Sequence, residues 1–498
     1  MKPWRMLCLL FFSVVAISSA QNSPSTSPNA LSPEKRFKMG HSVHGEAFDR
    51  GPREKPWEME GIGNTHFAIT TRHPEVQKWF DQGHTLLHSF WFYEAERAFR
   101  WCLKLDPECA MAYWGLARAV EDQDHSRTLI QEAVKRKGNV SERERSFIEA
   151  WAERWKDNIA NPTSNEAAGD LREKQFKARL EGICLKYPED LEARALLALE
   201  NLGSGNRLGS ELLLQQVLER NPVHPGAHHY RIHNWDGREG EVAVDSCAQY
   251  GRIASQIGHA QHMPGHVYSG IGMWHEAAIS MDSATRVEAA YMRRRLTFPF
   301  NTWNYAHNRN YLSYIQEQLG MSEAALAGAR SLLAAPLDPK YDDAEKYGTH
   351  WQGMIALMRG SIKFERWKEI LDTKTFPWRD VTRDKMYRAY CETLAHLGLE
   401  ESGKALKRYA DHAALKKEME KPDNKWLEET FAVQSLELQS LIALGQGETL
   451  NGLGLLADAA RRELRMREQG NDPPSYPNVL YNTLGRAYLR HRSPAFGS

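Results

Sequence analysis

The stretch Trp79–Pro107, WFDQGHTLLHSFWFYEAERAFRWCLKLDP, decides the fold. It contains two runs in which apolar residues recur every three or four positions, which is the spacing of amphipathic helices. Gly83 in the first run and Ala95 in the second are small, so the two helices can cross closely. Phe99 is large enough to fill the space between neighbouring helix pairs, and Pro107 ends the second helix. The stretch therefore predicts a helical hairpin.

The offsets of these residues resemble the tetratricopeptide pattern W-x2-L-G-x2-Y, then A-x3-F, then P. Two positions differ, because Gln82 replaces the Leu and Leu86 replaces the Tyr. Pro222 follows Pro188 by 34 residues, which is one tetratricopeptide period. Further repeats are marked by Gly265, Gly320, Tyr347, Tyr387 and Tyr481. The resemblance implies an all-α fold, an α-solenoid of tetratricopeptide-like helical hairpins in which each pair packs on the next.

Length and composition exclude several classes of protein. A chain of 498 residues is too long for one compact core. Hydrophobic residues make up 42% and charged residues 26%, which is typical of globular chains and not of disordered ones. Lys plus Arg and Asp plus Glu both number 64, so we expect no nucleic-acid partner. Six cysteines are too few for a disulfide scaffold in a chain of this size.

The amino terminus predicts export. Residues 1–20 begin with positive charge, continue through the apolar run Leu7–Ile17 and end in small residues, as a signal peptide does. The alternative is an N-terminal membrane anchor, but the run is too short to span a bilayer, and no stable membrane span is expected elsewhere. Residues 21–56 are expected to form a disordered lead-in. Helical lobes are expected over 57–335 and 336–498, in a periplasmic or extracellular protein.

Histidines gather in the middle of the chain. Four of the 20 histidines fall within Val223–Asn234 and four within Gly258–Glu276. In repeat register, one pair takes positions 5 and 9 of the first helix of a repeat, and a second pair takes the same positions of the next repeat. An i, i+4 spacing places both rings on one side of a helix, and neighbouring helices lie about 8–10 Å apart. The predicted metal ligands are therefore His229, His233, His262 and His266, with His228 at the edge of the face and His307 on the following first helix.

Two uses of these histidines remain open. Convergent neutral imidazoles suit copper or zinc, whereas magnesium and calcium prefer oxygen ligands. The alternative is a wet groove in which the imidazoles contact a peptide or nothing. No catalytic residue is assigned, because no HExxH string, phosphate-binding loop or nucleophile elbow is present. Pro264, between His262 and His266, either kinks a helix or marks its start.

Three strings resemble those of a group of large bacterial tetratricopeptide proteins. They are HHYRIH at His228–His233, HMPGHVY at His262–Tyr268 and DPECAMAYWG at Asp106–Gly115. The group carries HHYxIH followed by an HMPSH-like string, so Gly265 here stands in place of a serine. Phe92 and Tyr93 stand where the group has Asn-His, so one further ligand is missing. The resemblance implies the fold and a shared His-bearing groove, but no reaction.

We therefore expect an exported tetratricopeptide-repeat protein whose concave, His-rich groove binds a peptide or a partner protein. The alternative is a metal-dependent enzyme, of oxidase or hydrolase type, with a His-coordinated transition metal in that groove. The recognition role of most helical-repeat folds favours the first function. The register of the histidines favours the second, so whether the protein is an enzyme stays open.

Overall fold

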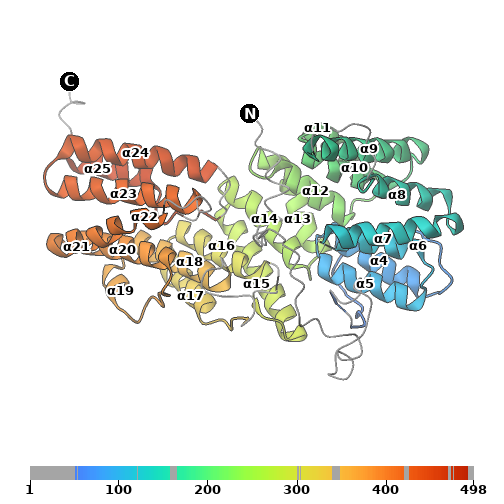
Figure 1. Ribbon diagram of the computed structural model, residues 1–498, viewed down its shortest axis with the longest axis horizontal. Coiled ribbons are helices and arrows are strands. Elements are labelled where there is room, and N and C mark those ends of the chain that lie inside the picture. Colours follow the sequence, from blue (N-terminus) through green and yellow to red (C-terminus); the bar gives the residue numbers. More distant parts are fainter. Residues whose placement is uncertain are drawn as a thin grey trace, which may run out of the picture. The chain divides into compact units, whose positions relative to one another are not determined.

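The computed structural model describes residues 51–52, 54–120, 122–156, 165–299, 302, 304–338, 348–419, 425–468, 473–474 and 476–491. The predicted signal peptide and nearly all of the predicted lead-in lie outside these residues, so export stays a prediction. Within the described residues the secondary structure consists of helices and contains no strand (Figure 1). The predicted all-α fold is confirmed.

The chain divides into two compact units, Met1–Met273 and Trp274–Ser498. This division comes earlier in the chain than the predicted lobe boundary at 335/336. The described helices of the first unit are α4 (Val76–His88), α5 (Phe92–Leu105), α6 (Ala110–Ala119), α7 (Gln123–Arg136), η2 (Lys137–Asn139), α8 (Glu142–Glu153), α9 (Asn165–Lys186), α10 (Leu191–Ser204), α11 (Arg207–Arg220), α12 (Pro225–Trp235), η3 (Gly240–Ala243), α13 (Val244–Ile253) and α14 (Gly258–Gly270). Those of the second unit are α15 (Trp274–Arg295), α16 (Tyr305–Gln318), α17 (Ser322–Leu333), α18 (Thr349–Lys363), α19 (Trp367–Leu371), α20 (Thr382–Gly398), α21 (Ser402–Ala414), α22 (Lys416–Met419), α23 (Lys425–Gly445), α24 (Thr449–Glu468) and α25 (Leu480–His491).

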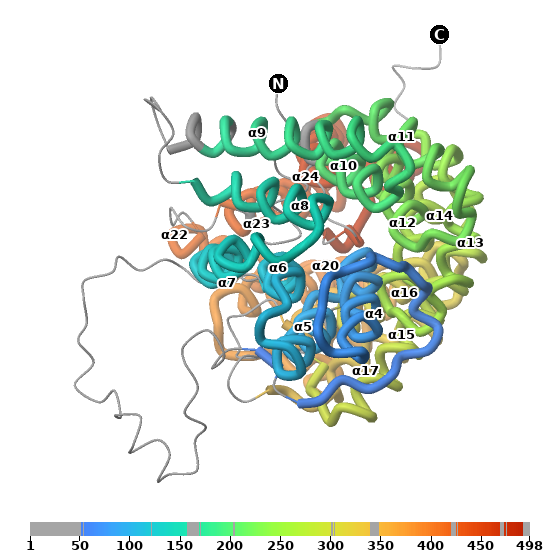
Figure 2. The backbone as a smooth tube through the Cα atoms, turned by 90° about the vertical axis from the view of Figure 1, so that its right-hand side faces the viewer, coloured from blue at the N-terminus to red at the C-terminus, as the bar shows by residue number. Residues whose placement is uncertain are grey.

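Helices of the first unit pack mainly on their neighbours in sequence. α4 packs on α5, α6 on α7 and α10 on α11, and α10, α12 and α14 also touch one another in succession. This is the nearest-neighbour packing of an α-solenoid. Figure 2 shows α4 to α14 following one another around this unit, and α12 returns to contact α4. Residues far apart in sequence are therefore brought together.

The predicted hairpin is formed by α4 and α5, and Phe99 joins it to α6. A Cβ atom on Gly83 would lie 2.9 Å from the Phe99 ring, and one on Gly115 would lie 2.5 Å from it. Both distances are shorter than a carbon–carbon contact allows. The prediction that Phe99 fills the space between neighbouring helix pairs is confirmed.

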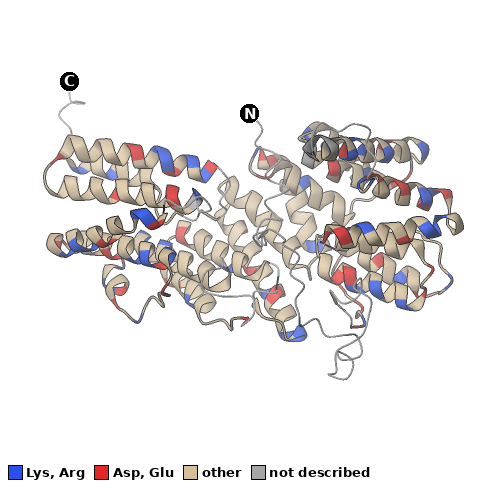
Figure 3. Ribbon diagram, viewed as in Figure 1, with Lys and Arg blue, Asp and Glu red and all other residues tan. Residues whose placement is uncertain are grey.

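The distribution of charged residues and the state of the cysteines agree with what the composition of the chain predicts. Figure 3 shows Lys and Arg interspersed with Asp and Glu along the described helices of each unit. Cys102, Cys109, Cys184, Cys247 and Cys391 are separate thiols. Among the described helices, none is both long enough and apolar enough to cross a bilayer.

Filling the space beside Phe99 tests this packing. We expect Gly115→Ala to destabilise the first unit by about 1–3 kcal/mol, because the added methyl group overlaps the ring. Gly182→Ala is the matched control, since a Cβ there meets no atom within 4 Å. That control is expected to stabilise helix α9 by about 0.5–1 kcal/mol. Denaturant titration followed by circular dichroism measures both; equal effects of the two substitutions would contradict the packing.

The second unit buries a carboxyl group between α15 and α16. Glu288 accepts a hydrogen bond of 2.7 Å from the side-chain amide of Asn308. Burial raises the pKa of Glu288 to about 8, against the opposing effect of its hydrogen bonds from Asn308 and the Asn304 backbone. The folded unit therefore holds a neutral acid at neutral pH, whereas the unfolded chain holds a carboxylate.

This pKa makes the second unit less stable as the pH rises. A raised folded pKa contributes stability below about pH 4.5, and that contribution is lost as the pH rises toward 8, by at most about 1.4 kcal/mol per pH unit. We expect Glu288→Gln to be more stable than the wild type at pH 8 and similar to it at pH 4.5. The exposed carboxylate Glu323, replaced by Gln, is the control. Urea unfolding at the two pH values measures the stability of each variant. An effect of Glu288→Gln that does not change with pH would refute the buried neutral acid.

Candidate metal centre in the first unit

Helices α12 and α14 pack together and carry the histidine pairs. α14 runs from Gly258 to Gly270 with Pro264 inside it, so the alternative that Pro264 marks the helix start is wrong. The proline lacks an N–H, so it cannot donate the helical hydrogen bond to the carbonyl of Ala260, and it lies between His262 and His266. α14 contains no Lys, Arg, Asp or Glu, so its polar character comes mainly from histidine.

Three imidazoles from these helices converge on one point. His229 Nε2 lies 3.0 Å from His233 Nε2 and 2.9 Å from His259 Nε2. His229 and His259 are buried and His233 is half-buried. One ligand atom from each residue lies within 4.8 Å of the other two. We call His229, His233 and His259 the tri-histidine cluster.

A backbone carbonyl fixes the tautomer of His229. Its Nδ1 lies 2.6 Å from the carbonyl oxygen of His88, the last residue of α4. A carbonyl only accepts, so Nδ1 carries the proton and the Nε2 of the neutral ring has a lone pair. One lone pair faces two further Nε2 atoms, and it cannot accept a well-directed hydrogen bond from both. Tetrahedral nitrogen ligands about 2.1 Å from a shared ion would lie about 3.4 Å apart, so His233 and His259 would each move about 0.5 Å away from His229 to admit one.

Phe90 forms one wall of the tri-histidine cluster. Its ring centre lies 4.5 Å from that of His229, 5.5 Å from that of His233 and 5.9 Å from that of His259. The Phe90 backbone has φ +55°, in the left-handed region where glycine usually ends a helix. A bulky residue in this conformation costs about 1–3 kcal/mol, and such strain is concentrated at functional sites.

Two imidazoles of the tri-histidine cluster, those of His229 and His233, are neutral at neutral pH. Burial lowers the pKa of His229 well below its usual value, and the nearby His233 lowers it further. Burial also lowers the pKa of His233 to about 3, with a smaller effect from His266. Metal binding requires neutral imidazole, so these rings need not lose a proton before they coordinate an ion.

The other predicted pair lies beside this cluster. His262 Nε2 and His266 Nε2 are 2.8 Å apart, and the rings of His259 and His262 stack with centres 5.6 Å apart. Asp236 Oδ2 lies 3.8 Å from His266 Nδ1, too far for a hydrogen bond. The structure therefore brings together His229, His233, His262 and His266 as two adjacent pairs, and it adds His259 between them.

The structure does not bring His228 into the tri-histidine cluster. His228 Nδ1 lies 3.1 Å from Ser246 Oγ, and its Nε2 lies 2.9 Å from the carbonyl oxygen of Pro222. Both ring nitrogens are thus engaged on another side of α12. His307 is half-buried on α16 of the second unit, and its predicted place near the other histidines stays a prediction.

Sequence reasoning missed four residues of the first unit. His259 lies in the recognised Gly258–Glu276 cluster, but in the first turn of α14 and not at position 5 or 9. His84, His88 and Glu192 form a second group of possible metal ligands. The signal for two of them was present, since His84 and His88 have the same i, i+4 spacing inside the stretch that decides the fold. Nothing in the sequence pointed to Glu192.

Comparisons with known proteins add little. No protein-family model matches the chain, and no curated protein matches it. Among solved structures, the chain is similar to the crystal structure of the P58(IPK) TPR domain at 2.5 Å, with 15% identity and a TM-score of 0.18. The match covers 84% of this chain and 99% of that one. We draw no functional conclusion from a likeness this distant.

The tautomers in α12 can be measured directly. In metal-free protein we expect His229 to be protonated at Nδ1, because that atom faces the His88 carbonyl. The adjacent His228 is expected to have the opposite tautomer, because its Nε2 donates to the Pro222 carbonyl. Long-range 1H–15N NMR of the 15N-histidine-labelled chain, assigned with His229→Gln and His228→Gln, distinguishes the two. Protonation of His229 at Nε2 would contradict the described geometry.

Proposed function

We propose that the first unit is a metal-binding helical-repeat domain in which His229, His233 and His259 hold a transition-metal ion. One observation carries the proposal: the single Nε2 lone pair of His229 faces two other imidazole Nε2 atoms at 2.9 and 3.0 Å. This one lone pair cannot accept a well-directed hydrogen bond from both rings, whereas one cation can be shared by all three.

The ligand atoms indicate the kind of metal. Three neutral imidazoles suit copper or zinc, and they leave the charge of the ion uncompensated. A water molecule or an anion therefore completes the shell. Three protein ligands and one exchangeable position are the arrangement of catalytic zinc sites, whereas structural zinc sites are closed by four protein ligands. We therefore propose a metal centre with the number of protein ligands found in catalytic zinc sites, and we assign it no reaction.

The helical repeats supply a rigid frame for this centre. Stacked helical hairpins serve mainly in protein recognition, so the fold suggests a protein-interaction role. We extend the proposal to an exported protein in which the metal centre lies on a recognition scaffold. The support for export is the order of charge, apolar run and small residues in 1–20.

Metal analysis tests the tri-histidine centre. The mature chain, purified without chelator, is expected to contain copper or zinc, and His259→Ala is expected to contain one equivalent less per chain. The loss follows because two imidazoles alone bind such an ion weakly. Inductively coupled plasma mass spectrometry gives the metal content, and circular dichroism reports on the fold.

His228→Ala is the matched control, because His228 is next to His229 on α12 but contacts Ser246 and Pro222. Its metal content is expected to equal that of the wild type. Negligible metal in the wild type, or equal metal in the wild type and in folded His259→Ala, would overturn the proposal. Peptide binding by a metal-free groove would then be the better function.

A further inference from the structure

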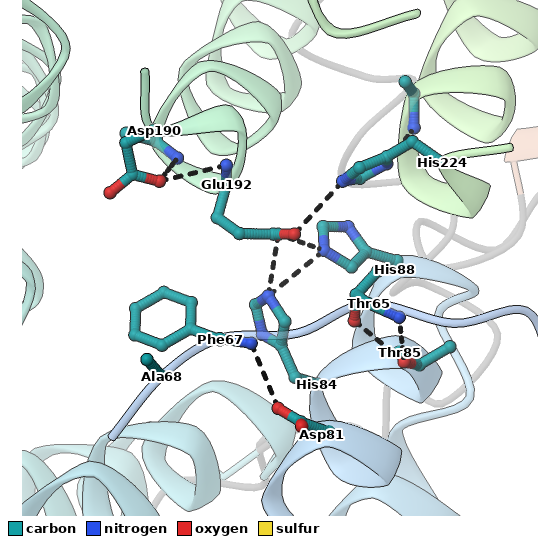
Figure 4. Close-up of polar contacts among 12 residues, drawn as sticks. Thr65, Phe67, Ala68, Asp81, His84, Thr85, His88, Asp190, Glu192 and His224 are labelled. Carbon is teal, nitrogen blue, oxygen red and sulfur yellow. Dashed lines mark hydrogen bonds and ion pairs between the residues drawn. The ribbon is translucent and has the colours of Figure 1, made fainter. Parts of the chain in front are cut away.

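We infer that the first unit has a second metal site, where His84, His88 and Glu192 bind a first-row divalent cation. This site lies between α4 and α10 (Figure 4) and shares no ligand with the tri-histidine cluster. It differs in chemistry as well, because one of its three ligands is a carboxylate.

The three ligand atoms form a compact triangle. Glu192 Oε2 lies 2.8 Å from His84 Nε2 and 2.8 Å from His88 Nε2. The two Nε2 atoms are 3.3 Å apart. All three side chains are buried, with exposed fractions of 3%, 2% and 8% for His84, His88 and Glu192. Tetrahedral ligands of one ion lie about 3.4 Å apart, so the two imidazoles already have nearly this separation, and Glu192 Oε2 would move about 0.6 Å from each of them to admit the ion.

Local sequence places each ligand. His84 and His88 lie one turn apart on α4, so both rings project from one face. Asp190 is the N-cap of α10, and its carboxylate accepts hydrogen bonds of 3.1 Å from the backbone N–H groups of Glu192 and Ala193. This cap fixes the first turn of α10 and directs the Glu192 side chain at α4 (Figure 4).

His224 and Tyr230 contact the proposed ligands but do not belong to the ligand set. His224 is the N-cap of α12, and its Nδ1 accepts a hydrogen bond of 3.0 Å from the Ala227 backbone N–H. The proton of its neutral ring is therefore on Nε2, which donates to Glu192 Oε1 at 3.2 Å. Tyr230 contacts His88 Nδ1 through its hydroxyl at 2.9 Å. Such outer contacts orient metal ligands and fix their tautomers.

The charge of this group also favours a cation. The Glu192 carboxylate is buried, and it places one oxygen, Oε2, 2.8 Å from both His84 Nε2 and His88 Nε2. Arg118 supplies a positive charge that interacts with His84 and Glu192. Its buried Nη1 has no hydrogen-bond partner among the described residues.

Apolar rings enclose the site. The ring centre of Phe67 lies 5.1 Å from that of His84, and the ring centre of Trp114 lies 6.3 Å from it. The segment that carries Phe67 is held across α4 by a hydrogen bond from the Phe67 backbone N–H to Asp81, at 3.0 Å. Low polarity around a carboxylate strengthens its attraction for a cation. A buried charge is stable only when it is paired or coordinates a metal.

The ligand set narrows the class of ion. Two imidazoles and one carboxylate hold iron(II) in facial triads, and they hold zinc in one class of catalytic site. Because His224 is committed as a hydrogen-bond donor, three protein ligands leave at least one position for water or a small anion. The site therefore prefers a harder ion than the all-imidazole tri-histidine cluster does.

The test uses Co²⁺ alone as the probe. The full mature chain is stripped with chelator, reloaded with Co²⁺, desalted and analysed for metal per chain. Glu192→Gln keeps the size of the side chain and removes its charge, and we expect it to bind one equivalent less than the wild type. Glu153→Gln is the matched control, because Glu153 is also buried and its ion pairs with Lys156 and Arg179 use only one oxygen, Oε1, which glutamine keeps. The control is expected to bind as much Co²⁺ as the wild type.

Two measurements keep the inference open to refutation. If Glu192→Gln folds and binds as much Co²⁺ as the wild type, Glu192 only accepts hydrogen bonds from imidazoles and the inference is wrong. If that variant does not fold, anomalous scattering from a Co²⁺-loaded wild-type crystal decides. A cobalt peak beside Glu192 Oε2 supports the site, and its absence overturns it. Loss of one equivalent in His259→Ala but not in Glu192→Gln would leave the tri-histidine proposal standing alone, and the reverse would leave only this site.

Discussion

The hydrogen bond from His229 Nδ1–H to the His88 carbonyl connects the two groups of histidines. It joins residues 141 positions apart in the chain and ties α12 to the end of α4. The last carbonyls of a helix lack a partner within it, so this contact satisfies one that would otherwise be buried unpaired. It also sets the tautomer of His229 and holds the backbone of His88, whose own ring faces Glu192. The tri-histidine cluster therefore depends on the backbone carbonyl of His88, a residue whose ring belongs to the other candidate site.

Burial is the second constraint on these sites. An imidazole removed from water is neutral at physiological pH, so it keeps a lone pair for a metal but cannot balance the charge of a carboxylate. In the tri-histidine cluster, His229 and His233 consequently offer neutral ligands. The group around Glu192 adds a buried carboxylate to two imidazoles. The two candidate sites of the first unit thus differ in the hardness of their ligands, because only one of them includes a carboxylate.

The local backbone is unusual where the sites lie. Phe90 adopts a left-handed conformation that glycine would adopt at less cost, and its ring packs on three histidines. Pro264 lies inside α14 between two histidines and removes a helical hydrogen bond. Phe90 does not stabilise α4, which it follows, and Pro264 does not stabilise α14, which contains it. Both are understandable if the geometry of the histidines matters more than the stability of those helices.

The sequence by itself determined the hairpins and the histidine pairs, because both follow from spacing along one helix. Gly83, Phe99 and Pro107 predicted the first hairpin, and the i, i+4 rule placed His229 with His233. The same rule applies to His84 and His88. Only the tertiary structure decided which pairs meet, which neighbour points away and where a carboxylate joins them. His228 and His229 are adjacent in sequence but project about 100° apart around the helix, so one reaches Pro222 and the other reaches His88. Glu192 contacts His84 and His88 of α4 from 108 and 104 positions further along the chain, and no local pattern encodes contacts between residues so far apart.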